Sequence, residues 1–285
     1  MASELSRRLA VAAIGIPAVV AAVWLGGWVL GSLLALAAAG AAWELYRMAR
    51  QLGTRAFVAA GCLLAASFPL IATAAPGEGP ATSWFWRAAL LTTLLLSAAA
   101  IWRRGVAGRP LASVGVTLLA AVLTGGTLAY ALFLRRMEGV AGADPDALAG
   151  SMLVGFPLIL TWVSDSGAYF GGRAYGRRKL IPAVSPGKTV EGALAGVLGT
   201  IAAGLLYAWL LQLAGVPLPL LAGAAGGALV SVVAQVGDLS ESLLKREAGV
   251  KDSGTLFPGH GGLFDRVDSL LFTVPASFWY LSLVL

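Results

Sequence analysis

The chain alternates long apolar runs with short polar breaks from end to end. A helix that spans a bilayer needs about 20 mostly apolar residues, and charged residues or Gly and Pro mark where such runs end. On this basis the pattern predicts about nine membrane-spanning helices. They lie at about 9–26, 28–45, 56–75, 84–102, 111–134, 150–171, 190–213, 218–238 and 268–285. The predicted fold class is all-α, that of a polytopic integral membrane protein.

The first apolar run follows a charged start at Arg7 and Arg8, as the apolar run of a secretory signal peptide does. No convincing small-residue cleavage site precedes the next run, which continues directly as "WLGGWVLGSLLALAAA". We therefore expect the first run to be retained as a helix. Only Gly26 and Gly27 separate it from the second run, so the two could form one tight hairpin.

Composition supports the membrane assignment, because 58% of the residues are hydrophobic, 12% are charged and the mean hydropathy is +0.83. The chain has one cysteine, Cys62, so no intramolecular disulfide can form, and its place in an apolar run is typical of a small buried side chain. The formal net charge is +6. Its basic residues fall in short loops, which favours an anionic lipid leaflet or a phosphate-bearing substrate over nucleic acid as the partner.

The basic residues also predict an orientation, because nine spans sort the loops to two sides of the membrane. One side holds 17 of the 20 Lys and Arg residues. These are Arg7, Arg8, Arg47, Arg50, Arg55, Arg103, Arg104, Arg109, Arg173, Arg177, Arg178, Lys179, Lys188, Lys245, Arg246, Lys251 and Arg266. The other side holds Arg87, Arg135 and Arg136. Basic loops stay in the cytoplasm, so the N-terminus is predicted to be cytosolic and the C-terminus to lie on the far side.

Four acidic residues fall within or at the ends of predicted spans: Glu44, Asp165, Glu191 and Asp238. A carboxylate near the middle of a span costs about 2.5–3.5 kcal/mol on insertion scales, so each one calls for a reason. All four lie toward the predicted cytosolic ends. A transporter would need polar residues through the membrane depth, and often inverted repeats, neither of which the sequence shows. The acids instead predict a polar pocket that opens on the cytosolic face.

The polar residues divide the chain into residues 1–149, with about five spans, and residues 150–285, with about four spans and the candidate catalytic loops. The first polar segment of the second part is "WVSDSGAYFGGRAYGRRKL", residues 162–180. Asp165 and Tyr169 share a helix face, and Gly171 and Gly172 are expected to end the helix before a basic loop. Asp165 would then orient a ligand beneath the cations of this loop, which attract phosphate. Alternatively, the cations only set the membrane topology, and Asp165 forms one structural ion pair with them.

The second polar segment, residues 181–196, contains "SPGKTVEG". A P-loop is excluded, because Pro182 stands where the motif needs glycine and no preceding strand is indicated. What remains is a turn at Ser185, a cation at Lys188 and a helix start with Thr189 as the expected N-cap. Backbone N–H groups at this start, beside Lys188, could bind an anion, whereas Glu191 is equally explained as a structural partner of the helix dipole.

The third polar segment leaves the eighth span as "AQVGDLSESLLKREAGVKDSGTLFPGHGGLFDRVD". Asp238, Glu241, Ser242 and Lys245 are spaced to form one helical stripe. Asp265 and Asp268 follow at the head of the ninth span, three apart, so we expect them on one helix face.

Oxygen ligands in this arrangement suit Mg²⁺ held together with substrate phosphates. Zinc is disfavoured, because the chain has one His and one Cys, far apart in sequence. His260 is either a proton-transfer group or a residue that orients the loop. From these residues the chain is predicted to be a membrane enzyme of metal-dependent phosphoryl or nucleotidyl transfer at the cytosolic surface.

Residues 242–268, "SLLKREAGVKDSGTLFPGHGGLFDRVD", resemble the signature of the phosphatidate cytidylyltransferases, or CDP-diacylglycerol synthases. The matching positions are Ser242, Lys245, Arg246, Lys251, Asp252, Pro258, His260, Gly261, Gly262, Asp265, Arg266 and Asp268. "DSGAYFGGRAYGRR" and "SPGKTVEGALAG" resemble the two upstream blocks of the family, whereas the first half is similar only in hydropathy and in "WELYR" around Glu44. The pattern of a CDP-alcohol phosphotransferase is missing.

The resemblance implies a reaction of CTP with phosphatidate that yields CDP-diacylglycerol and pyrophosphate. It also implies Mg²⁺, K⁺ as a possible second cation, and a homodimer in the inner (plasma) membrane of a bacterium with its active site facing the cytoplasm. Asp238 and Asp265 match the metal-binding aspartates of the family. The predicted catalytic residues are Asp238, Asp265, Asp268, Lys245 and Lys251. The predicted substrate- and phosphate-binding residues are Asp165, Ser185, Lys188, Ser242, Arg246, His260 and Arg266. Gly187 departs from the family, which more often has a second lysine there.

Overall fold

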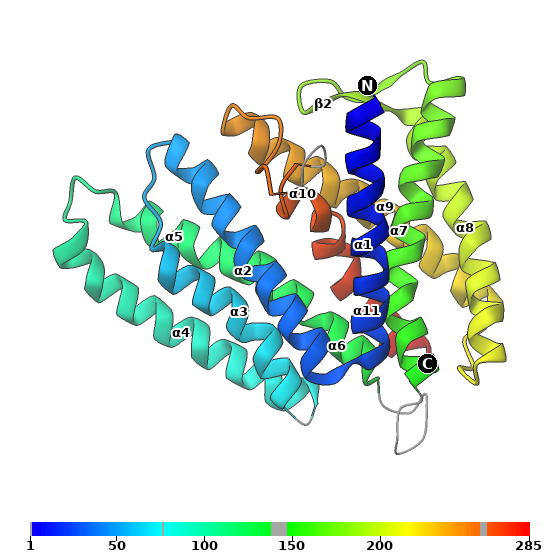
Figure 1. The fold of residues 1–285 in the computed structure, drawn as a ribbon, viewed down its shortest axis with the longest axis horizontal. Coiled ribbons are helices and arrows are strands. Elements are labelled where there is room, and N and C mark those ends of the chain that lie inside the picture. The colour runs from blue at the N-terminus through cyan, green and yellow to red at the C-terminus, as the bar shows by residue number, and fades with distance from the viewer. Residues whose placement is uncertain (1, 76, 138–146, 257–260) are drawn as a thin grey trace. The chain divides into compact units, whose positions relative to one another are not determined.

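The computed structural model describes residues 2–75, 77–137, 147–256 and 261–285, and most of them are helical (Figure 1). The first elements are α1 (Ala2–Leu25), α2 (Gly27–Gln51), α3 (Val58–Ala74), α4 (Glu78–Arg103), α5 (Pro110–Ala121), a π-helical turn η1 (Val122–Gly126) and α6 (Tyr130–Arg135). The remaining elements are α7 (Ala147–Tyr175), β1 (Lys179–Ile181), β2 (Ser185–Thr189), α8 (Val190–Leu213), α9 (Leu220–Glu247), α10 (Phe264–Val267) and α11 (Leu270–Val284).

The all-α membrane fold class is confirmed. Among the described residues, seven helical segments are long and apolar enough to cross a membrane, and two further apolar helices, Gly15–Leu25 and Val58–Ala74, are shorter. Every predicted span falls on a helix, and the span predicted at 111–134 corresponds to Pro110–Arg135 with the π-helical turn inside it. The number nine and the cytosolic N-terminus stay predictions.

The chain forms two compact units. Residues 1–133 and 247–267 make the first, and residues 134–246 and 268–285 make the second. Residues 247–267 therefore pack with the N-terminal helices, although they are far from them in the sequence.

The first unit is built on the close packing of α2 against α3. Glycines permit it, since a Cβ on Gly31 would collide with the side chain of Thr73 and one on Gly61 with the side chain of Tyr46. The hydroxyl of Tyr46 donates to the carbonyl oxygen of Thr117 on α5 at 2.8 Å. Such bonds matter inside a membrane, because lipid offers no partners for polar groups.

The second unit is built on α7 and α8, which pack along their length. Contrary to expectation, Gly171 and Gly172 do not end α7, which continues to Tyr175. Their role is close approach: a Cβ on Gly171 would collide with Ala195 of α8, and one on Gly172 would come within 3.0 Å of Thr189 Oγ1. Backbone hydrogen bonds continue through both glycines because small residues at a helix interface allow tight packing without breaking the helix.

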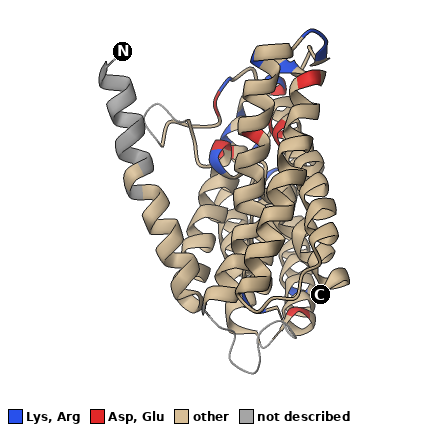
Figure 2. Cartoon of the chain, turned by 90° about the vertical axis from the view of Figure 1, so that its right-hand side faces the viewer, with Lys and Arg blue, Asp and Glu red and all other residues tan. Residues whose placement is uncertain are grey.

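Buried hydroxyl pairs connect further helices of the second unit. Ser164 of α7 and Ser231 of α9 lie 2.7 Å apart through their Oγ atoms, and Thr161 of α7 donates to Thr273 of α11 at 3.2 Å. The charged residues of this unit, in contrast, lie mainly toward one end of the helices (Figure 2). This end carries the candidate site.

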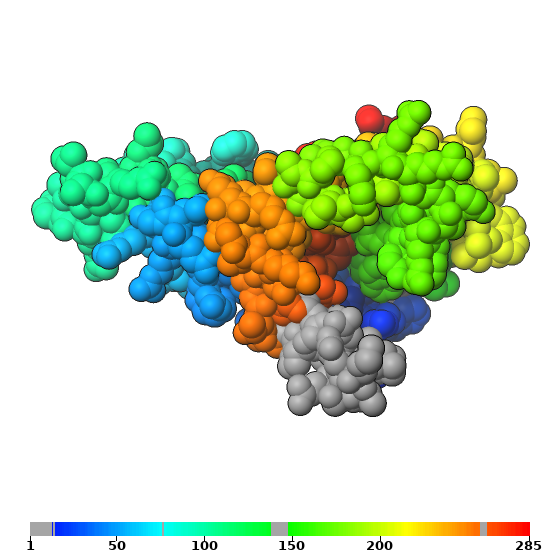
Figure 3. All heavy atoms as spheres, turned by 90° about the horizontal axis from the view of Figure 1, so that it is seen from above, coloured from blue at the N-terminus to red at the C-terminus, as the bar shows by residue number. Residues whose placement is uncertain are grey.

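A short antiparallel hairpin stands at that end, with Lys179 opposite Thr189 and Ile181 opposite Ser185. A strand therefore precedes α8 directly, which the sequence did not indicate. The five residues of β2, "SPGKT", include Pro and Gly and lack the alternation of apolar and polar residues that predicts a strand. The hairpin is largely exposed, and Figure 3 views the molecule from this end.

Candidate active site

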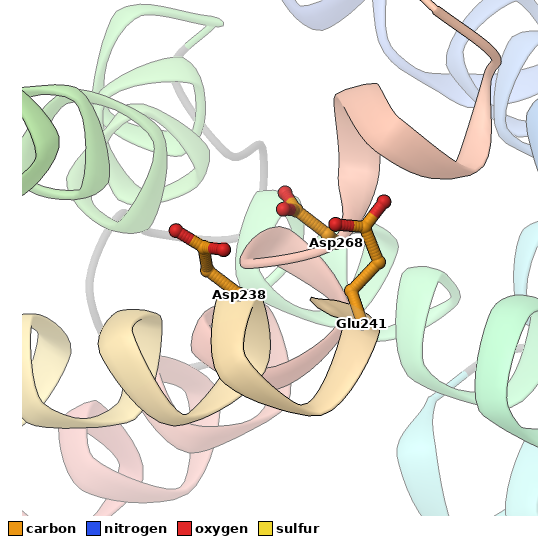
Figure 4. Close-up of side chains that lie close together, drawn as sticks. All are labelled: Asp238, Glu241 and Asp268. Carbon is orange, nitrogen blue, oxygen red and sulfur yellow. The ribbon is translucent and has the colours of Figure 1, made fainter. Parts of the chain in front are cut away.

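The candidate site of the second unit centres on three carboxylates, those of Asp238, Glu241 and Asp268. Each offers one oxygen, and these oxygens lie within 4.8 Å of one another. Asp238 and Glu241 are one helical turn apart on α9, and Asp268 approaches them from the start of α11 (Figure 4). Glu241 is only 4% exposed. A buried carboxylate beside two others needs cations, because like charges at this distance repel strongly.

Two lysines supply positive charge. Lys188 Nζ lies 2.6 Å from Asp238 Oδ2, and Lys245 Nζ lies 2.7 Å from Glu241 Oε2. Ser242 Oγ donates to Asp238 Oδ1 at 3.4 Å. The stripe predicted on α9 is thus confirmed as a geometric arrangement.

The helix is interrupted beside Asp268, the third member of the cluster. We expected Asp265 and Asp268 on one face of one helix, but α10 ends at Val267 and α11 begins at Leu270. The backbone N–H of Ser269 donates to Asp268 Oδ1 at 2.6 Å. This local bond competes with helix continuation, as short polar side chains commonly do. Asp265 belongs to the first unit and Asp268 to the second.

Three sets of hydrogen bonds hold the hairpin that carries Lys188. Thr189 caps α8 as predicted, with its Oγ1 accepting from the N–H of Gly192 at 3.1 Å. The Glu191 carboxylate accepts from the backbone N–H groups of Arg177, at 2.9 Å, and Arg178. Arg246 Nε donates to the carbonyl oxygen of Val184 at 3.3 Å. Glu191 and Arg246 therefore both have structural partners.

Asp165 lies on α7 with an exposed side chain, within electrostatic reach of Asp238, Asp268 and Lys188. Ser185 begins β2, in the same hairpin as Lys188. The second unit thus contains most of the predicted site residues. Asp165, Ser185, Lys188, Asp238, Ser242, Lys245, Arg246 and Asp268 belong to it.

Asp265 lies in the first unit, where its Oδ2 accepts from the backbone N–H groups of Ser253, at 2.9 Å, and Gly262, at 2.6 Å. The hydroxyl of Ser253 lies 3.0 Å from the same oxygen. Asp238 and Asp265, which the sequence predicted to bind one metal ion, thus belong to different units. Their shared metal site stays a prediction.

Glu44 of α2 was among the four acids that predicted a polar pocket, but it was not among the predicted catalytic or binding residues. It is 1% exposed and lies against the same loop as Asp265. It accepts from Ser253 Oγ at 2.6 Å, from the N–H of Leu263 at 2.9 Å and from the N–H of Phe264 at 2.8 Å. The available signal was a carboxylate inside an apolar span. The sequence also predicted that Glu241 lies on the α9 stripe, but it did not predict Glu241 as a metal ligand.

Lys251 lines a pocket of about 340 Å³ between the end of α2 and residues 250–255, with Arg47 and Asp252 also on its wall. The two cations outnumber the single carboxylate on this wall, and the remaining positive charge suits a ligand with negative charge. Arg266 is exposed at α10. His260 and Pro258 lie outside the described residues.

A family model and one known protein match nearly the whole chain, and other relatives match about half of it. A sequence model of the Cytidylyltransferase family matches residues 6–284. A phosphatidate cytidylyltransferase of Synechocystis is 33% identical over 98% of this chain and 97% of the relative. One of Bacillus subtilis is 38% identical over 60% of the chain and 59% of the relative, and one of Brucella suis is 47% identical over 43% and 44%. Identity is higher in these shorter matches than in the full-length one.

Proposed function

The chain belongs to the cytidylyltransferase family, and we propose that it transfers the cytidylyl group of CTP to phosphatidate, giving CDP-diacylglycerol and pyrophosphate. The observation that carries this proposal is the cluster of three carboxylates and two lysines at one end of membrane-spanning helices. Both substrates are phosphate esters, and one of them is a lipid. The acyl chains can stay in the leaflet while the headgroup meets soluble CTP at the membrane surface.

The donor set of the cluster fits Mg²⁺. Asp238, Glu241 and Asp268 offer oxygen atoms only, which is the ligand type that Mg²⁺ prefers, and it usually shares them with substrate phosphates. Bound there, Mg²⁺ would neutralise charge on the phosphate oxygens during transfer. Asp265 is proposed as a further ligand on the basis of the family resemblance. A second cation such as K⁺ and a homodimer rest on the resemblance alone.

The lysines supply the second source of positive charge. Lys188 and Lys245 are held by Asp238 and Glu241 on the α9 stripe, so their ammonium groups are pre-oriented toward the same space as the carboxylates. We assign them to the equatorial phosphate oxygens of CTP, with Arg246, Lys251 and Arg266 as further candidates. Phosphoryl-type transfer depends mainly on such positioning and charge stabilisation.

The enzyme is an integral membrane protein. Because the relatives named above are bacterial, we propose that it lies in the inner membrane of a bacterium. We propose that the charged end of the second unit faces the cytoplasm, where CTP is available. A cysteine-labelling experiment tests this orientation: a single cysteine introduced at Lys179, in a Cys62→Ala background, should be reached by impermeant reagent only after the membrane is opened.

Purified protein in lipid nanodiscs with Mg²⁺, CTP and phosphatidate should release pyrophosphate and form a lipid-linked cytidine product. ATP, GTP and UTP in place of CTP are the nucleotide controls, and diacylglycerol in place of phosphatidate is the lipid control. Transfer that does not require the lipid phosphate would contradict the proposed acceptor, and equal use of all four nucleotides would contradict the proposed donor.

Replacing Lys188 with Ala should lower kcat/KM for CTP roughly 10- to 100-fold, the equivalent of one lost charge-assisted hydrogen bond. The matched control is Lys179→Ala, which removes an exposed lysine from the other strand of the same hairpin. Steady-state kinetics over a range of CTP concentrations would measure both variants. Equal effects of the two substitutions would show that Lys188 acts only through the general charge of the hairpin.

A further inference from the structure

Glu44 is a buried acid in a membrane-spanning helix, far in sequence from the residues that it contacts. It lies near the end of α2, within the candidate span Gly27–Gln51. Its Oε2 accepts from Ser253 Oγ and from the N–H of Phe264, and its Oε1 accepts from the N–H of Leu263. Both carboxylate oxygens are thus used, which offsets the cost of burying the charge.

The partners of Glu44 come from both ends of one polar loop. Ser253 lies before residues 257–260, which the structure does not describe, and Leu263 and Phe264 lie after them. One side chain on α2 therefore holds the two ends of the loop against the first unit. Steric fit points the same way, because a Cβ on Gly262 would collide with both carboxylate oxygens of Glu44.

The contacts continue from Glu44 to Asp265 through Ser253. The hydroxyl of Ser253 lies 2.6 Å from Glu44 Oε2 and 3.0 Å from Asp265 Oδ2. A hydroxyl has one proton to donate, so it serves one carboxylate at a time, and the shorter distance favours Glu44. Asp265 Oδ2 also accepts from the N–H groups of Ser253 and Gly262, both of which lie in the part of the loop that Glu44 holds.

We propose that Glu44 is a positioning residue of the transfer reaction: it fixes residues 253 and 262–264 so that Asp265 is presented in one orientation. The inference rests on the proposed function, in which Asp265 is a ligand of the metal ion. It gives the N-terminal helices a part in catalysis beyond anchoring the chain in the membrane. A misplacement of about 1 Å at a reacting centre can cost about 100-fold in rate, so a clamp of this kind has a large effect without touching substrate.

The test compares Glu44→Gln with Glu78→Gln, the same chemical change at an exposed acid of the first unit. Both are made in the full chain and reconstituted in nanodiscs. The amide substitution leaves one acceptor oxygen and replaces the other with a donor, which faces N–H or O–H groups that also donate. Glu44→Gln should speed hydrogen exchange of the Ser253, Leu263 and Phe264 amides at least about 10-fold, because local opening becomes easier.

The same variant should lower kcat by about 100-fold while KM for CTP changes by less than about threefold, because orientation and not nucleotide binding is lost. Glu78→Gln should match the wild type in both measurements. Ser253→Ala serves as a second variant if Glu44→Gln does not accumulate in the membrane. It removes the hydroxyl link but leaves the two backbone bonds to Glu44, so faster exchange and a smaller loss of kcat are expected.

Unchanged exchange in Glu44→Gln would overturn the clamp. Faster exchange with a normal kcat would overturn the positioning role and leave Glu44 as a structural residue only. A wild-type protein that transfers no cytidylyl group would instead overturn the proposed function, and an exchange difference seen in that case would again mark Glu44 as structural.

Discussion

Replacing Asp238 with Asn is expected to lower kcat at least about 100- to 1,000-fold, the usual effect of removing one preorganised charged group from an active site. Glu241→Gln should have an effect of the same order, because both carboxylates belong to one cluster and each holds a lysine. Asp265→Asn is expected to be equally damaging. Steady-state kinetics with saturating CTP and phosphatidate would measure all three variants.

Metal binding gives a readout that does not depend on turnover. Titration with Mn²⁺, followed by electron paramagnetic resonance, should show weaker binding in each of the three variants. Glu247→Gln, at the end of the same helix as Asp238 and Glu241, is the matched control and should stay within about twofold of wild type. Normal metal affinity in Glu241→Gln would remove Glu241 from the metal site. The same result in Asp265→Asn would leave Asp265 with a role in the loop alone.

Replacing Gly204 with Ala should destabilise the protein by about 1–3 kcal/mol, the typical cost of overpacking. A Cβ on Gly204 of α8 would collide with the backbone carbonyl of Gly223 on α9, and backbone cannot move aside as a flexible side chain can. The two helices would have to separate. The midpoint of thermal unfolding in detergent, followed by intrinsic tryptophan fluorescence, would measure the change.

Gly199 of the same helix provides the control. Its Cβ would meet only Val163 Cγ1 at an ordinary contact distance of 3.8 Å. Gly199→Ala should be neutral or should raise the unfolding midpoint, because Ala favours helix over Gly by about 1 kcal/mol. A stability loss of equal size in both variants would show that the α8 glycines matter for a reason other than close helix packing.

Local sequence patterns predicted both the positions of the helices and parts of the site. Apolar runs predicted where the helices lie, because a span must satisfy its backbone internally and face lipid. The α9 stripe followed from the 3.6-residue period, and Asp238, Glu241, Ser242 and Lys245 occur on one face as expected. The Thr189 cap followed from the preference of hydroxyl side chains for helix starts.

Other features could not be read from local pattern. Gly171 and Gly172 resemble a helix end in the sequence, yet they allow α7 to pack on α8, a role that depends on a neighbour about 20 residues away. The two strands of the hairpin show no clear alternation of apolar and polar residues, so the sequence did not predict them. The break at Asp268 depends on a side chain that competes for the N–H of Ser269.

By itself the sequence determined the all-α membrane fold, the family and the residue types of the site, because periodicity and a long spaced signature are properties of the linear chain. The tertiary structure alone decided which charges meet. Lys188 reaches Asp238 through a hairpin, Asp268 joins Glu241 at a helix break, and Glu44 contacts residues more than 200 positions away. The reason is physical: a helix dictates neighbours three and four residues apart, whereas contacts between helices depend on how closely their surfaces can pack.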